Sequence, residues 1–61
     1  MEIKEQIKLI ITIQANLRKQ ALQHRMNGDN VVSFNYRVQA NYLNHVIFSL
    51  KSIEQEEKSI R

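Results

Sequence analysis

The sequence predicts an all-α fold, a two-helix antiparallel hairpin that pairs with a second copy of itself to form a four-helix bundle. Two long segments repeat apolar residues at steps of three and four, the spacing that places side chains on one face of a helix. They are separated by one strong turn signal, Asn-Gly-Asp-Asn at 27–30, which holds the only glycine of the chain. At 61 residues the chain is too short for a self-sufficient core, so we expect it to oligomerise.

The first helix is expected at about 2–27. Its apolar residues follow helical spacing and define one face that should pack against the second helix. They are Ile3, Ile7, Ile10, Leu17 and Ala21, with Ile11 and Leu22 alongside.

The break between the helices is expected at 28–30. Gly28 can adopt the left-handed backbone conformation that ends a helix, and Asp29 or Asn30 can cap the next one. The second helix is then expected at about 31–58. An alternative at its start is a short extended segment, because residues 31–34 are β-branched and aromatic apart from one serine. That interpretation would give two strands and a helix.

The second helix carries a regular heptad pattern that we interpret as its packing face. This predicted face contains Val32, Tyr36, Gln39, Leu43, Val46, Leu50, Ile53, Glu57 and Ile60. A short break between two helices of similar length predicts an antiparallel pair. The whole chain, residues 1–61, is therefore expected to form one helical-hairpin domain.

A second line of residues follows the second helix at the same spacing, away from the predicted packing face. It consists of Phe34, Val38, Asn41, His45 and Phe48. A helix that is apolar on two sides usually lies between two neighbours, so we expect a second copy or a foreign protein on this side. The alternative is that the two phenylalanines are incidental, since scattered exposed apolar side chains are normal.

Basic charge concentrates near the turn when it is counted along the sequence. Residues 17–37 hold Arg18, Lys19, Arg25 and Arg37 against a single acidic residue, Asp29, which accounts for the whole net charge of +3. Such a patch can bind an acidic protein surface, with arginines as anchors beside aromatic residues. It can also bind nucleic-acid phosphates, or form a solvated rim over the core.

The composition argues against several classes of protein. The chain has no cysteine, which excludes disulfides and thiolate metal sites, and no proline. No signal-peptide pattern is present, and the longest run of aliphatic residues, 9–11, is far below the roughly 20 needed to span a membrane. We therefore expect a cytoplasmic protein without a membrane partner. Neither His24 nor His45 has an acidic residue one or two helical turns away, so we expect no enzyme, metal ion or cofactor.

These observations favour a small non-enzymatic protein that binds, and regulates or inhibits, a larger protein, as small phage, plasmid and bacterial regulators do. We expect it to act as a homodimer. The predicted contact residues are Phe34, Tyr42, His45, Phe48, Arg18, Arg25 and Arg37. One alternative is a basic helical bundle that binds nucleic acid. A second alternative is a structural subunit of a helical oligomer.

Overall fold

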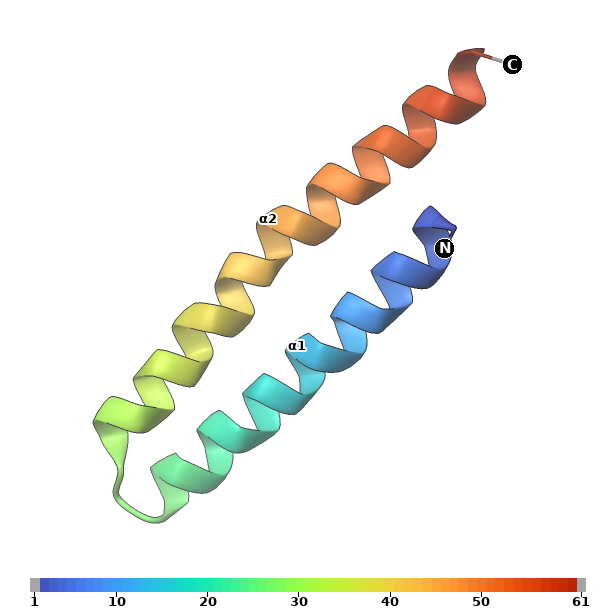
Figure 1. Ribbon diagram of the computed structural model, residues 1–61. Coiled ribbons are helices and arrows are strands. Elements are labelled where there is room, and N and C mark those ends of the chain that lie inside the picture. The colour runs from blue at the N-terminus through green and yellow to red at the C-terminus, as the bar shows by residue number, and fades with distance from the viewer. Residues whose placement is uncertain (1, 61) are drawn as a thin grey trace.

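The computed structural model describes residues 2–60, with side chains for residues 2–58. Two helices, α1 (Ile3–Met26) and α2 (Asn30–Ile60), lie side by side in opposite directions and are joined by a short turn (Figure 1). The all-α hairpin predicted from the sequence is confirmed. Within the described residues there is no strand, and the alternative of an extended segment at 31–34 is wrong, because these residues form the first turn of α2.

The turn closes α1 with a Schellman motif, which explains why the chain reverses here. Gly28 has a φ of 85°, the left-handed conformation that glycine adopts without steric cost. The amide of Asp29 donates to the carbonyl of His24 at 2.8 Å, and the amide of Gly28 donates to the carbonyl of Arg25 at 3.1 Å. The carbonyl of Asp29 then accepts the first bond of α2, from the amide of Ser33 at 2.9 Å.

The seam between the helices follows an uninterrupted heptad pattern on both sides. Every member is buried or half-buried. From α1 the seam contains Ile3, Ile7, Ile10, Gln14, Leu17, Ala21 and His24; from α2 it contains Ser33, Tyr36, Ala40, Leu43, Ile47, Leu50 and Glu54.

The face predicted for α2 is correct at three positions and wrong at four, while Val46 is half-buried beside the seam. Tyr36, Leu43 and Leu50 belong to both patterns. The predicted Val32, Gln39, Ile53 and Glu57 are exposed, whereas their neighbours Ser33, Ala40 and Glu54 turn toward α1; Ile47 is buried and Val46 lies at the margin of the seam. The side chain of Ile60 lies outside the described residues. On α1, Ile11 and Leu22, expected alongside the packing face, are exposed.

Small side chains cause this difference because they let the helices approach closely near the turn. Ala21, Ser33 and Ala40 are buried, and Ala40 has no exposed surface at all. The Ser33 hydroxyl donates to the carbonyl of Ala21 at 2.7 Å, so a short side chain of α2 reaches the backbone of α1. Valine at these positions would hold the helices farther apart, and the larger apolar residues of α2 therefore lie beside the seam.

Candidate binding faces

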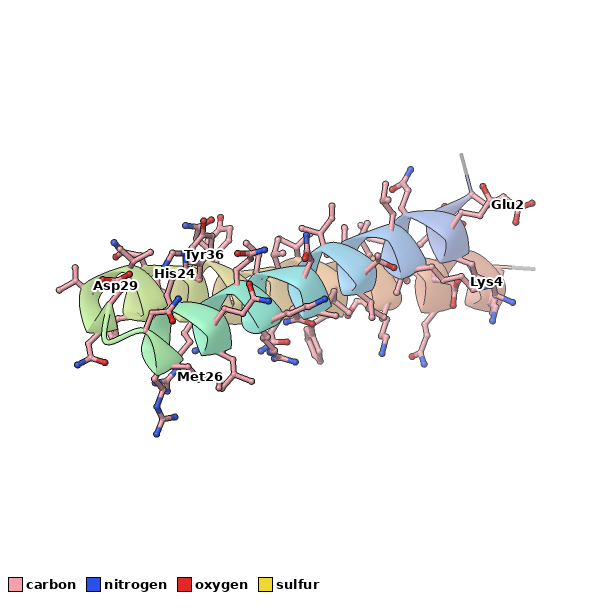
Figure 2. All side chains as sticks on the ribbon, turned by 90° about the horizontal axis from the view of Figure 1, so that it is seen from below. Glu2, Lys4, His24, Met26, Asp29 and Tyr36 are labelled. Atoms are coloured by element: carbon pink, nitrogen blue, oxygen red, sulfur yellow. The ribbon has the colours of Figure 1, made fainter. Side chains whose placement is uncertain are left out.

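The hairpin has two broad faces, one on each side of the plane that contains the helices. Three bonds mark one side of the seam: Ser33 to Ala21, and the Gln14 amide to the Ala40 carbonyl at 2.8 Å and to Asn44 Oδ1 at 2.6 Å. The stacked rings of His24 and Tyr36, with centroids 5.5 Å apart, mark the other side. Figure 2 shows these rings on the upper side of the hairpin and Lys4 on the lower side.

We call the first side the basic face. The heptad positions next to Gln14, Ala21, Ser33 and Ala40 hold four cations of α1 and three of α2, all of them exposed. They are Lys4, Lys8, Arg18, Arg25, Arg37, Lys51 and Lys58. These positions carry no acidic residue. Of these seven cations, only Lys58 forms an ion pair with a described side chain: its Nζ lies 3.8 Å from a carboxylate oxygen of Glu54, a residue of the seam.

Aromatic and apolar groups are interspersed among these cations. Phe34 and Phe48 occupy the same heptad position of α2, and they are 62% and 73% exposed. Ile11 and Leu22 of α1 lie on the same face. The basic face therefore combines positive charge with two exposed phenyl rings, which is a combination typical of binding surfaces rather than of a solvated rim.

The opposite side, which we call the uncharged face, has a different composition. Its heptad positions between residues 6 and 53 hold only apolar, amide and hydroxyl side chains, and acidic residues occupy these positions only at the open end, with Glu2 and Glu56. At the turn the face is bordered by His24 and its neighbour Asp29. Its members are Gln6, Leu9, Ile13, Asn16, Gln20, Gln23, Val32, Asn35, Gln39, Tyr42, Val46, Ser49 and Ile53. Most are exposed, so the single hairpin leaves a long surface without charge in contact with water.

The structure divides the residues predicted as a contact site between different surfaces. Arg18, Arg25, Arg37, Phe34 and Phe48 share the basic face. The other two predicted residues lie elsewhere: Tyr42 belongs to the uncharged face, and His45 lies on the outer side of α2. The rings of Tyr42 and His45 are neighbours on this helix and contact each other edge to face.

Sequence reasoning missed the separation of charge by face. Counting charge along the chain places it at the turn, but Lys4, Lys8, Lys51 and Lys58 extend the same face to the open end of the hairpin. The signal is present in the sequence, because the basic residues occupy two adjacent heptad positions. It becomes visible only once the correct seam of α2 is known.

His24 has a carboxylate neighbour that its own helix does not supply. Its Nδ1 lies 3.5 Å from Asp29 Oδ2 across the turn, five residues away and therefore outside the spacings of one or two helical turns on which the sequence prediction rests. The ring of His24 stacks on Tyr36 of α2, and its Nδ1 faces the Asp29 carboxylate in the turn, so His24 links the end of α1 to the start of α2. Within residues 2–58, histidine and carboxylate side chains do not gather in groups of three that could hold a metal ion.

The comparisons with known proteins give no match, either to a family model, to a curated protein or to a solved structure. In addition, neither helix, over its described length, carries a stretch long and apolar enough to cross a membrane.

Proposed function

We propose that this chain is a non-enzymatic binding protein that forms a homodimeric four-helix bundle through its uncharged face and binds a polyanionic partner through its basic face. The observation that carries the proposal is the separation of the surface into one face with seven cations and no acid, and another without charge over most of its length. The two surfaces suit two different occupants.

A second copy of the chain fits the uncharged face for electrostatic reasons. In a two-fold dimer each face meets its own copy, so any net charge on it would meet the same charge. Seven cations on the basic face would repel their copies across such a contact. The uncharged face instead offers leucine, isoleucine, valine and amide side chains, and amides can both donate and accept hydrogen bonds.

The size of the uncharged face also suits a dimer. The Cα trace measures 52 × 16 × 12 Å, and the helices run side by side over the 24 residues of α1. At 1.5 Å per residue this is a length of about 36 Å, and with the width of 16 Å each chain offers a contact area of roughly 600 Å². Two chains would bury about 1,200 Å², the lower end of the range for specific interfaces. The single hairpin needs this burial, because none of the large apolar side chains among residues 2–58 is fully buried.

Two isoleucines of α1 provide a matched test of the dimer. Ile13 lies on the uncharged face and Ile11 on the basic face, and their exposed fractions are 45% and 44%. We expect Ile13→Glu to give a monomer in sedimentation equilibrium, because two buried carboxylates would meet across the interface. Ile11→Glu should retain twice the chain mass of 7.2 kDa. Equal masses for the two variants, with helix content preserved by circular dichroism, would refute the uncharged face as the interface.

The binding of polyanions is tested by retention on immobilised heparin. We expect the double variant Arg18→Gln, Arg25→Gln to elute at clearly lower salt than the native protein, because each lost contact weakens a salt-dependent interaction. Lys19→Gln is the control, since Lys19 carries the same charge but lies on the outer side of α1. An effect of Lys19→Gln that is half as large as that of the double variant, or larger, would mean that each charge contributes equally wherever it lies, and it would contradict the assignment of the basic face.

The larger protein partner favoured by the sequence remains a second candidate. Its supporting observation is that Phe34 and Phe48 lie exposed beside Arg37 and Lys51, since arginine next to an aromatic residue is a frequent anchor of protein interfaces. In this case the native chain would retain one stoichiometric protein from lysate after nuclease treatment, and Phe48→Asp would lose it. A dimer whose basic-face variants all behave as the native chain would instead indicate a structural subunit.

A further inference from the structure

We propose that the polyanion bound by the basic face is single-stranded nucleic acid, with Phe34 and Phe48 stacking on unpaired bases and the adjacent cations contacting phosphates. The inference rests on the proposed function and deepens it by naming the partner. Its basis is the placement of two exposed aromatic rings, each with a group of basic side chains, on a face whose heptad positions carry no acidic residue.

The two phenylalanines are arranged as separate platforms on one line of α2. They are 14 positions apart on the same face of the helix, which corresponds to about 21 Å at 1.5 Å per residue. Because both rings are mostly exposed, each offers a planar apolar surface to a ligand. Every nucleobase has a flat face of similar size, so such rings bind unpaired bases with little preference for sequence.

The cations form one group around each ring. Near the turn, Arg37 follows Phe34 by three residues, and the register of the Ser33 and Gln14 bonds places Arg18 and Arg25 across the seam. At the open end, Lys51 follows Phe48 by three residues, with Lys4 and Lys8 of α1 across the seam. Each ring therefore has three basic side chains near it, as a base with its flanking phosphates requires.

The residues between the two groups argue against a membrane surface as the partner. Asn41 and Asn44 separate the phenylalanines on α2, so the face lacks the continuous apolar stripe with which a helix enters a lipid interface. Amide groups can instead donate to and accept from base edges. A duplex would satisfy the cations but would leave the rings without a function, because paired bases are stacked on each other.

The test compares four labelled or competing probes against the full-length protein. Fluorescence anisotropy is measured with a 20-nucleotide single strand of mixed sequence and with the duplex of that sequence. Vesicles containing phosphatidylserine and the acidic polypeptide polyglutamate serve as competitors. The variants are Phe34→Leu and Phe48→Leu, which keep an apolar side chain but remove the ring. His45→Leu is the control, because it removes an exposed ring from the outer side of α2, which belongs to neither face.

We expect the single strand to bind more tightly than the duplex, and each phenylalanine variant to weaken it by about tenfold, in line with the loss of one stacked base. His45→Leu should leave the affinity within about twofold. Equal, salt-dependent binding of strand and duplex with no effect of Phe34→Leu or Phe48→Leu would overturn this inference and leave the proposed function intact. The inference would likewise be overturned if vesicles or polyglutamate displaced the labelled strand at a concentration of negative charge below that of the unlabelled strand needed for the same displacement. No binding of any probe would overturn both.

Discussion

Ala40 provides the sharpest test of the close helix contact, because it has no exposed surface and lies where the helices approach each other. The perturbation is Ala40→Leu, which adds three heavy atoms to a site without free space. Gln14 covers this site, since its side-chain amide donates to the Ala40 carbonyl at 2.8 Å. A leucine must displace that side chain or force α1 and α2 apart.

Both outcomes lower the free energy of unfolding. Overpacking of a tight site costs about 1–3 kcal/mol. The displaced Gln14 also gives up its bonds to Ala40 and Asn44, each of which contributes about 0.5–1.5 kcal/mol. We take about 3 kcal/mol as the expected loss, a large part of the roughly 3–9 kcal/mol that a chain of this length can hold. In thermal unfolding this corresponds to a decrease in Tm of about 12–24 °C.

The assay is thermal unfolding followed by far-UV circular dichroism at one fixed protein concentration, because dimerisation makes Tm depend on concentration. Ala15→Leu is the matched control: it adds the same atoms to α1 at an exposed position. We expect its Tm to change by only a few degrees, in the range usual for surface substitutions. Equal Tm values for the two variants, or a rise in Tm for Ala40→Leu, would refute the argument that small residues set the helix separation.

Three further substitutions test other parts of the hairpin. Gly28→Ala should lower the unfolding free energy by about 1 kcal/mol, because the φ of 85° disfavours a side chain. No atom lies within 4 Å of the added Cβ, so backbone strain is the only cost. Asn27→Ala, at a φ of −90°, is the control, and urea unfolding measures both variants. Ser33→Ala should lower the unfolding free energy by about 1 kcal/mol through loss of its 2.7 Å bond to Ala21, and a change below about 0.3 kcal/mol would show that the bond contributes little. Gln14→Leu should keep or raise Tm, because the added apolar burial at this buried position offsets the two lost bonds. The number of amide peaks in a ¹H–¹⁵N NMR spectrum should increase as alternative registers become populated. A single set of peaks would contradict a role for Gln14 in fixing the register.

The helices and the turn could be predicted from the sequence because their signals are local. Helical spacing and a lone glycine followed by Asp29 are sufficient to place α1, the reversal and α2. The observed helices begin and end within two residues of the expected bounds, 2–27 and 31–58.

The rotation of α2 about its own axis could not be predicted from hydropathy. An apolar pattern through Val32, Val46 and Ile53 is more hydrophobic than one through Ser33 and Ala40, and it is the wrong choice. The packing term that decides is the distance between the helices, which depends on pairs of residues from both segments. The seam predicted from hydropathy turns α2 by roughly one seventh of a circle and mixes the two faces, so it does not reveal the basic face as one surface.

The short connection between the helices also decides which molecule each helix pairs with. If residues 27–29 continued the helix instead of reversing at Gly28, α1 and α2 would merge into one rod of about 87 Å, at 1.5 Å per residue. Two such rods could form every pairing of the hairpin, such as Ser33 with Ala21, between chains rather than within one. Pairing of α1 with α2 within one chain is an intramolecular step that does not depend on dilution, whereas the exchanged form would be populated only as concentration rises. The backbone preference of a single residue therefore separates helix pairing within one chain from helix exchange between molecules.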